Sequence, residues 1–370
     1  MFMAKKIRNI ICTVCFSAFI VALGAACFLR EPVEILVSER RKAAQMPEAS
    51  VESVMDKSFF DDFESYLTDQ FFMRDGFRSI NAAIRMKLLR QTDNNKVYLA
   101  EGHISEFQSV LNEKSVKATA EKLNSIYDKY IKGKNARVYF SVVPDKNYYL
   151  AEKNGFPSLD YGRMLDIFTS EVMNMEYIDI FDCLTADDYY RTDSHWKQEN
   201  LAAVVDRLGE KMGFKVRPFD EYKSEKITDF EGVYAPRLAI GKIKDEIIAL
   251  SSDVTDSAKV FNLEINKTTQ GVYDKSKLSG YDKYEYYLSG AAAFLTVENP
   301  LAEEKKELVV FRDSFGSSLV PLMLEGYSKI TVIDIRYISP QILGEYVDFT
   351  DCDVLFIYNT LILNQSNILK

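Results

Sequence analysis

The chain has 370 residues, 47% of them hydrophobic, which is enough to build one large domain with further segments attached. A formal net charge of −9 argues against general binding to nucleic acid or to anionic membrane surfaces. Outside the N-terminal apolar stretch only Cys183 and Cys352 occur, and no His, Cys and carboxylate residues are grouped with metal-ligand spacing. The composition therefore excludes a disulfide scaffold and predicts no metal site.

The N-terminal residues 1–30 predict a membrane anchor. Lys5, Lys6 and Arg8 precede an uncharged apolar stretch at 9–29, and about 20 apolar residues are enough to span a bilayer. A basic leader stays in the cytoplasm, so the remainder of the chain is expected on the extracytoplasmic side. A cleaved signal peptide is the alternative, because Gly24-Ala25-Ala26 offers a small-residue cleavage site. The length of the stretch favours an uncleaved, single-pass signal anchor.

Residues 31–92 are predicted to form a solvated stalk followed by amphipathic helices. Apolar residues recur at helical spacing from Val51 to Phe71. A second helix carries four apolar residues on one face, namely Phe77, Ile80, Ile84 and Leu88. We expect these helices to pack together or onto the main domain, with Asp69 paired to Arg74 between them.

Residues 93–370 have the pattern of an α/β domain, in which short apolar runs alternate with amphipathic segments. Strands are expected at 96–99, 137–143, 177–181, 307–311, 329–335 and 354–358, and helices at 114–132, 160–174 and 201–212. This alternation predicts a mostly parallel sheet covered by helices on both faces. Residues 220–305 fit the rhythm poorly and are predicted to be an insertion with short β elements.

The two outer cysteines test the predicted strand directions. Cys183 follows the strand at 177–181, whereas Cys352 precedes the strand at 354–358. Parallel strands would place the two residues at opposite edges of the sheet, too far apart for a disulfide, which needs Cα atoms within about 7 Å. Both are therefore expected to be free thiols.

Histidine is the usual acid–base residue near neutral pH, and the chain has only two, His103 and His195. Only His195 has a carboxylate two residues away, in Asp193-Ser194-His195-Trp196. Asp193 can reach Nδ1 of His195 if the loop turns back, which would leave Nε2 free for a serine hydroxyl. The alternative is a surface or hydrogen-bonded histidine without a catalytic role.

A candidate nucleophile is Ser314, between the predicted strand at 307–311 and a helix that starts near Gly316. Sites in parallel sheets form at the carboxyl ends of strands, and backbone N–H groups at a helix N-terminus can stabilise an oxyanion. We expect the small residues 316–318 to let such groups approach a substrate oxygen. The alternative is that Ser314 only caps the helix. Because both segments follow parallel strands, we expect Ser314, His195 and Asp193 to converge.

These segments resemble the DHHW family of bacterial membrane-anchored proteins, which is related to the SGNH-hydrolase-like domains of alginate O-acetylation proteins. The resemblance rests on Asp193-Ser194-His195-Trp196 and Arg312-Asp313-Ser314-Phe315-Gly316, with weaker blocks in the same order. These weaker blocks are Ser38-Glu39-Arg40-Arg41, Asp69–Asp75, Val97–Leu99 and Val143–Lys146. The family's first histidine is Ser194 here, so the implied base is His195. The order, with Asp-x-His before the serine, implies a circularly permuted SGNH-like arrangement.

The resemblance implies one further site residue, Arg336, and the positions of other residues in the predicted elements indicate more. Arg336 is expected near the acyl or sugar site, or alternatively at the surface in a pair with Asp334. Lys146 and Tyr337 fall at predicted strand ends and are expected to line the site. Trp196 is expected either to form a sugar platform or to anchor its loop in the core. Asp313 is expected to brace the serine turn and not to react.

The sequence thus predicts a membrane-anchored, extracytoplasmic SGNH-like α/β protein that transfers an acyl group, most simply acetyl, to a hydroxyl of a cell-envelope or secreted polysaccharide. Such chemistry needs no metal or organic cofactor. The resemblance implies a multi-spanning membrane acyltransferase as the partner that supplies the acyl group. Two alternatives stay open. One is an acetylesterase with water as acceptor, and the other is a noncatalytic envelope or polysaccharide-binding protein.

Overall fold

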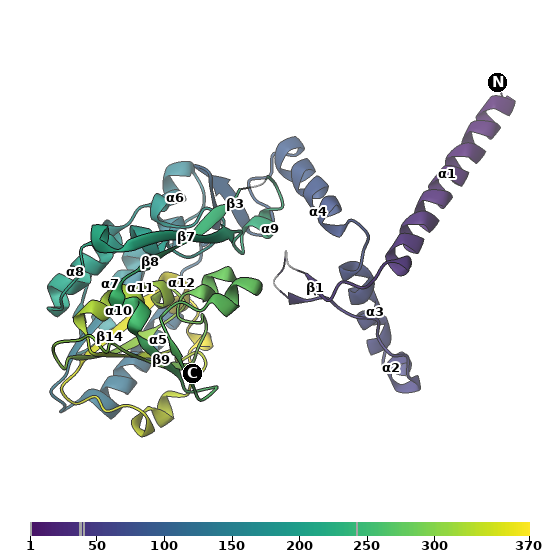
Figure 1. Cartoon of the computed structure of the whole chain (residues 1–370). Helices are drawn as coiled ribbons and strands as arrows, with labels where there is room; N and C mark the ends of the chain where they lie inside the picture. Colours follow the sequence, from purple (N-terminus) through teal and green to yellow (C-terminus); the bar gives the residue numbers. More distant parts are fainter. Residues whose placement is uncertain (1, 37–38, 40, 242) are drawn as a thin grey trace. The chain divides into compact units, whose positions relative to one another are not determined.

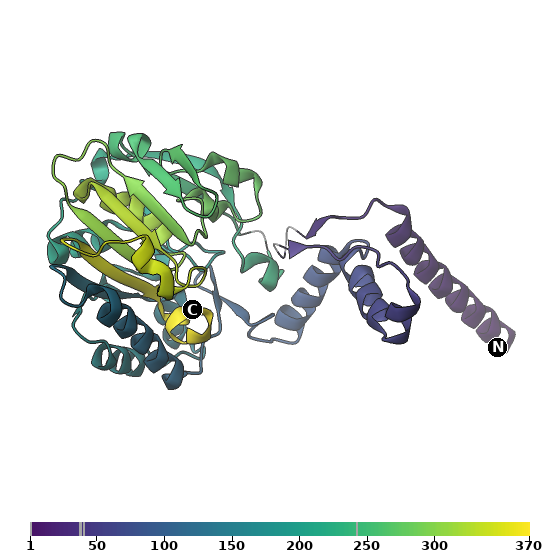
Figure 2. The same cartoon turned by 90° about the horizontal axis from the view of Figure 1, so that it is seen from below.

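The structure is a computed structural model that describes residues 2–36, 39, 41–241 and 243–370. Ser38 and Arg40 of the first family block lie outside the described residues. The chain divides into two compact units (Figures 1 and 2). One comprises residues 1–94 with 239–241, and the other comprises residues 95–238 with 242–370. We call them the N-terminal unit and the α/β unit.

The N-terminal unit begins with a single continuous helix, α1 (Phe2–Leu29). The segment Lys5–Leu29 has a mean hydropathy of 2.5, and none of its most apolar window is buried. The expected uninterrupted apolar helix is therefore confirmed, and by length and composition it is able to cross a membrane.

The rest of the N-terminal unit consists of a short two-stranded ribbon and three helices. Their bounds are β1 (Ile35–Leu36), β2 (Arg41–Lys42), α2 (Val51–Met55), α3 (Ser58–Asp69) and α4 (Arg74–Ala83), with a wider helical turn at Ile84–Leu88 extending α4. The predicted pair between Asp69 and Arg74 is wrong. Asp69 binds Arg41 through two hydrogen bonds of 2.6 and 2.7 Å, and Arg74 binds Glu39 at 2.5 Å. These contacts cross-link the ribbon to the helices.

The α/β unit is built on an eight-stranded sheet in the order β10-β9-β11-β13-β12-β14-β5-β6. The strands are β5 (Arg137–Val143), β6 (Glu176–Tyr177), β9 (Lys259–Asn262), β10 (Lys267–Gln270), β11 (Phe294–Glu298), β12 (Glu307–Arg312), β13 (Lys329–Ile333) and β14 (Asp353–Asn359). The neighbours from β13 to β6 pair in parallel, which confirms the mainly parallel sheet.

The predicted insertion contributes more to the sheet than expected. Strands β9, β10 and β11 join its edge in antiparallel register. A separate antiparallel pair is formed by β7 (Lys223–Phe230) and β8 (Asp245–Ser251). The expected strand at 96–99 also lies outside the main sheet, because β3 (Val97–Ala100) pairs only with β4 (His103–Glu106).

Helices cover both faces of the main sheet (Figure 2). The helices of the α/β unit are α5 (Glu113–Ile126), α6 (Lys146–Leu150), α7 (Tyr161–Glu171), α8 (Ala202–Met212), α9 (Ala235–Leu238), α10 (Asp253–Ser257), α11 (Gly316–Met323) and α12 (Thr360–Leu363). Side chains of β12 alternate between the layers, as a strand requires. Val310 packs in the core under α8 and α11, whereas Val309 and Phe311 pack in the core under α5 and α7.

Cys183 and Cys352 are both free thiols. The strand expected at 177–181 is shorter in the structure, because β6 ends at Tyr177 and Phe181–Cys183 forms a 3-10 turn. Cys183 therefore follows β6 at the end of this turn, and Cys352 precedes β14. Because β6, β5 and β14 pair in parallel, the residues belong to opposite edges of the sheet, which confirms the strand directions used above.

Candidate active site

Ser314 lies on a braced turn at the carboxyl end of β12. Every residue from Leu308 to Leu324 is buried except Ser314, which is partly exposed. The carboxylate of Asp313 accepts hydrogen bonds from the backbone N–H groups of Phe315, at 2.9 Å, and Asn359, at 2.7 Å. Burial raises the pKa of Asp313. Asp313 therefore ties the serine turn to the end of β14, in the bracing role expected from the sequence.

Ser314, His195 and Asp193 converge as predicted. The Nε2 atom of His195 lies 2.7 Å from Oγ of Ser314, and its Nδ1 atom lies 2.7 Å from Oδ1 of Asp193. Asp193 is fully buried, whereas the His195 side chain is 11% exposed. A carboxylate on Nδ1 holds the imidazole in the tautomer that presents a lone pair at Nε2. A hydroxyl, an imidazole and a buried carboxylate therefore lie in a hydrogen-bonded series.

The imidazole is also held by an aromatic ring that the sequence did not indicate. The Tyr284 ring stacks on His195 with a centroid distance of 3.9 Å and an interplanar angle of 11°. The Tyr284 hydroxyl lies 2.8 Å from Oγ of Ser318 in α11. Tyr284 comes from the segment predicted to be an insertion, where one tyrosine among many gave no signal of such a role.

A loop at residues 231–233 of the same segment donates a further hydrogen bond to the Asp193 carboxylate. The Val233 N–H donates to Oδ2 of Asp193 at 2.9 Å, and the Gly232 N–H donates to the Thr192 hydroxyl at 2.9 Å. A Cβ atom on Gly232 would lie 2.4 Å from Cβ of Asp193 and 2.4 Å from the Thr192 carbonyl oxygen. Residue 232 must therefore be glycine for this loop to approach the orienting carboxylate so closely.

Asp245 in β8 binds the segment that leads to Asp193, at residues 191–192. Its carboxylate accepts from the backbone N–H groups of Arg191 and Thr192, each at 2.8 Å, and from the Thr192 hydroxyl. The segment before Asp193 is thus held by backbone hydrogen bonds to a buried carboxylate, which are stronger than those between neutral groups.

Lys146 is placed beneath the site, which corrects the expectation that it lines the substrate space. Only 2% of Lys146 is exposed, and its ammonium donates to the backbone carbonyls of Tyr190 and Asp193, each at 2.8 Å. Burial lowers the pKa of Lys146 to about 7, an effect that the nearby Asp193 carboxylate opposes. Lys146 supports the Asp193 loop from within.

Trp196 is likewise an anchor and not a sugar platform. It is fully buried, and its indole Nε1–H lies 3.0 Å from both the Phe315 carbonyl and Oγ of Ser318. Because Phe315 and Ser318 flank the serine turn, the indole connects the histidine loop directly to the element that carries Ser314.

Of the four residues expected to line the site, Arg336 and Tyr337 remain accessible. The Tyr337 ring is exposed, and Arg336 lies 5.3 Å from its centroid. Arg336 also binds Asp334 through its Nε and a terminal nitrogen, at 2.9 and 2.6 Å. Pairing with Asp334 raises the pKa of Arg336 against the effect of its burial. Arg336 thus makes the expected Asp334 pair at the carboxyl end of β13.

The helix N–H groups are not available in the way the sequence suggested. The Phe315, Gly316 and Ser317 N–H groups donate within the turn, to the Asp313 carboxylate, the Asp313 carbonyl and the Ser314 carbonyl. Gly316 is required for packing, because a Cβ there would lie 2.7 Å from Cβ of Arg312. Gly316 therefore allows the close approach of α11 to β12.

The other histidine belongs to a different contact. His103 in β4 lies with its Nε2 atom 3.2 Å from Asp187, and burial lowers its pKa. Among the described residues no group of three His, Cys, Asp or Glu side chains could hold a metal ion.

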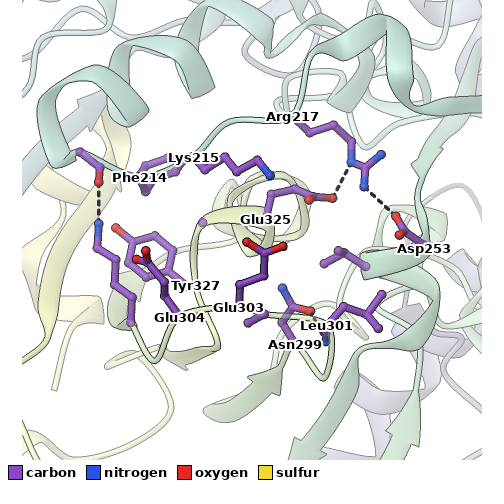
Figure 3. A pocket seen from close by; sticks show the side chains of 15 residues that line it. Phe214, Lys215, Arg217, Asp253, Asn299, Leu301, Glu303, Glu304, Glu325 and Tyr327 are labelled. Atoms are coloured by element: carbon purple, nitrogen blue, oxygen red, sulfur yellow. Dashed lines mark hydrogen bonds and ion pairs between the residues drawn. The ribbon is translucent and has the colours of Figure 1, made fainter.

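A hollow of about 340 Å³ is lined by the residues shown in Figure 3. It lies near the amino ends of β12 and β13, whereas Ser314 follows the carboxyl end of β12. Lys306 and Tyr327, which precede β12 and β13, line it together with Arg217, which binds both Glu325 and Asp253 at 2.6 Å. Since Ser314 follows β12, this hollow is separate from the candidate active site.

Comparisons with known proteins agree with this architecture. A DHHW family protein from Eubacterium siraeum superposes with a TM-score of 0.61 at 22% identity, covering 75% of this chain and 94% of its own. Bacillus cereus PatB1 with a sulfonyl adduct superposes with a TM-score of 0.54 at 14% identity, and the match covers 72% of this chain and 97% of PatB1. The O-acetyltransferase domain of Pseudomonas putida AlgJ is more distant, with a TM-score of 0.43 at 11% identity, covering 73% and 92%.

No curated protein sequence matches this chain. A family model described as DHHW protein matches residues 129–333, which is more than half of the sequence. This match contains Asp193, His195 and Ser314 together with the Tyr284 and Gly232 contacts described above. The chain therefore belongs to the DHHW family.

Proposed function

We propose that this protein is a membrane-anchored, extracytoplasmic acyltransferase that esterifies hydroxyls of a cell-envelope or secreted polysaccharide, with acetyl as the simplest acyl group. The observation that carries the proposal is the position of the His195 ring, 2.7 Å from both Ser314 and Asp193. Hydrogen-bonded contacts on both ring nitrogens are what a general base needs to activate a serine. A serine that only capped its helix would not need a histidine and a buried carboxylate behind it.

In this mechanism Ser314 Oγ attacks the acyl carbonyl carbon while its proton passes to Nε2 of His195. The tetrahedral adduct collapses, the bond to the donor group breaks, and His195 returns the proton to that leaving group. An acceptor hydroxyl then attacks the acyl-serine and gives its proton to His195. A new ester leaves and the Ser314 hydroxyl is restored. Asp193 remains ionised and stabilises the imidazolium in both halves.

The surroundings of the triad favour a site held rigidly in advance. Tyr284, Trp196 and Lys146 restrain the His195 loop from three sides, so little reorganisation is needed during proton transfer. The sulfonyl adduct of the structurally similar PatB1 suggests a probe for the present chain, because sulfonyl fluorides modify activated serines. Arg336 and Tyr337 are proposed to bind the donor or acceptor.

The membrane anchor and the extracytoplasmic location are also part of this proposal. Helix α1 is long and apolar enough to cross a membrane, and the basic residues before it favour a cytoplasmic N-terminus. This orientation would hold the triad outside the cell, where polysaccharide hydroxyls are found. An acyl group from the cytoplasm would then need to cross the membrane, which calls for a multi-spanning acyltransferase partner. If this partner exists, a multi-spanning acyltransferase should co-purify with the full chain.

The test is hydrolysis of a chromogenic acetyl ester by the detergent-solubilised full chain. Ser314→Ala should abolish release, and a sulfonyl fluoride should add its mass to the peptide that contains Ser314. The control is Ser125→Ala, which removes an exposed serine of α5 whose hydroxyl contacts only its own helix. If Ser314→Ala and Ser125→Ala kept equal activity, the catalytic proposal would fail and the binding-protein alternative would replace it.

Transfer and hydrolysis are separated by adding a hydroxyl acceptor. With a polysaccharide fragment present, a transferase should convert acyl-serine to sugar ester faster than to free acetate. An esterase should release acetate at a rate that the acceptor does not change. Mass spectrometry of the fragment and quantification of acetate distinguish the two.

A further inference from the structure

Helix α4 with its extension to Leu88 has an apolar face that the rest of the N-terminal unit leaves largely uncovered, although the Phe77 ring contacts the Phe71 ring. Phe77, Ile80, Ile84 and Leu88 recur at spacings of three or four residues, so they share one side of the helix. Each of these side chains is at least 44% exposed. The opposite side of the helix is occupied, since Ala82 is 1% exposed. The expectation that this apolar face packs against protein is not met within the N-terminal unit.

The same helix is strongly basic although the whole chain is acidic. Residues 74–90 contain five basic residues and one acidic residue, a formal charge of +4 against −9 for the complete sequence. Two of the five, Arg74 and Arg78, pair with Glu39, which leaves Arg85, Lys87 and Arg90 for an outside contact. Arg85, Lys87 and Arg90 are exposed and lie beside the apolar residues in the sequence. An amphipathic helix with a basic polar side and an exposed apolar face is typical of helices that lie in the interface of an anionic bilayer.

The start of this helix is tied to the end of α1. The Phe72 N–H lies 3.3 Å from Sγ of Cys27, which is buried in the last turn of α1. Phe72 and Met73 are themselves exposed apolar residues, and α4 begins at the next position. If α1 spans the bilayer, its last turn lies at the outer surface, so α4 starts at the depth of the lipid headgroups.

We propose that α4 and its extension bind the outer leaflet of the membrane that α1 crosses, with Phe77, Ile80 and Ile84 in the acyl boundary and the basic residues at anionic headgroups. The net charge of the chain does not oppose this, because the interaction is local to residues 74–90 and charges beyond about 10 Å are screened. The proposal rests on α1 being a membrane span and is independent of the proposed acyl transfer.

The experiment uses the full chain in vesicles of phosphatidylcholine and phosphatidylglycerol. The only native tryptophan, Trp196, is fully buried in the α/β unit and gives a constant background. Ile80→Trp places a reporter on the apolar face, and Ser79→Trp is the matched control on the adjacent exposed position that faces away. Phe16→Trp in α1 reports insertion of the span. Lipids brominated near the glycerol end of their acyl chains quench tryptophans at the interface, and lipids brominated near the methyl end quench tryptophans in the middle of the bilayer, such as that of Phe16→Trp.

The added emission of Ile80→Trp should be quenched at least about twofold more than that of Ser79→Trp. Raising the salt concentration or omitting phosphatidylglycerol should reduce the Ile80→Trp quenching and leave Phe16→Trp unchanged. Quenching of Phe16→Trp without quenching of Ile80→Trp would overturn the proposal and assign the face to a protein partner or to solvent. Equal quenching at positions 79 and 80 would also overturn it. Absence of quenching at Phe16→Trp would remove the membrane span itself.

Discussion

The ring of Tyr284 lies against the ring of His195, with centroids 3.9 Å apart and planes 11° from parallel. The stack fixes the plane in which Nε2 can meet Ser314. Replacing the ring by leucine should lower kcat about 3- to 10-fold with little change in KM, since stacking of this kind contributes about 0.5–1.5 kcal/mol. Tyr284→Phe keeps the stack and should retain kcat, while losing the hydroxyl contact to Ser318. Equal kcat values for the leucine and phenylalanine variants would exclude a positioning role for the ring.

Asp193→Asn should lower kcat by about 10³-fold or more, because an amide in place of the carboxylate favours the wrong imidazole tautomer. The Val233 N–H can still donate to the amide oxygen, so the fold should be retained. The measurement is steady-state hydrolysis of the chromogenic ester, with circular dichroism to verify folding. A well-folded Asp193→Asn protein with normal kcat would show that Asp193 does not orient the base.

Gly232→Ala should destabilise the α/β unit by about 1–3 kcal/mol, because its Cβ would overlap Asp193 and the Thr192 carbonyl. Gly162→Ala in α7 is the matched control. A Cβ there meets only an Asp160 oxygen at 3.6 Å, so alanine should stabilise the helix by about 0.5–1 kcal/mol. Chemical denaturation of both variants should therefore give shifts of opposite sign. A neutral Gly232→Ala would mean that the loop at 231–233 can move away from Asp193.

Glu199→Gln should change how stability depends on pH. Burial raises the pKa of Glu199 to about 7, from an ordinary 4.5, and its Oε2 atom has no hydrogen-bond partner among the described residues. The protonated form is favoured in the fold, so its contribution is complete below pH 4.5 and is lost as the pH rises through 7. The glutamine variant should match the parent in acid and exceed it by up to about 3 kcal/mol above pH 7. Parallel denaturation curves that keep a constant offset across this range would contradict the assignment.

The sequence indicated the residues of the candidate site because histidine is rare in this chain. The chain has only two histidines, and only His195 has an aspartate two residues before it. The strand before Ser314 correctly placed the serine at the carboxyl ends of the parallel strands. The mainly parallel order followed from alternating apolar runs in the same way. These features depend on local pattern, which is what periodicity and turn residues encode.

The supporting contacts could not be predicted because they depend on tertiary structure. Tyr284 and the 231–233 loop reach the triad from a polar segment with no clear period, and β10 exposes all four of its residues. The expectation that Lys146 lines the site was wrong for a related reason. Lysines are usually exposed, and nothing in Val143-Pro144-Asp145-Lys146 reveals that the ammonium is enclosed by two carbonyls.

Strand β14 lies in the middle of the sheet, between β12 and β5, yet it follows every other strand of that sheet in the sequence. Asn359 at its end donates its side-chain amide to the carbonyl of Val143, 216 residues earlier, and its N–H to Asp313. Until β14 has been synthesised, β12 and β5 therefore have no strand between them. The serine turn also lacks the hydrogen bond from the Asn359 N–H to Asp313. Such distant pairing is slow and leaves strand edges exposed to chaperones and proteases. The turn that carries Ser314 therefore cannot take its final, braced form until residue 359 has been synthesised and β14 has entered the sheet.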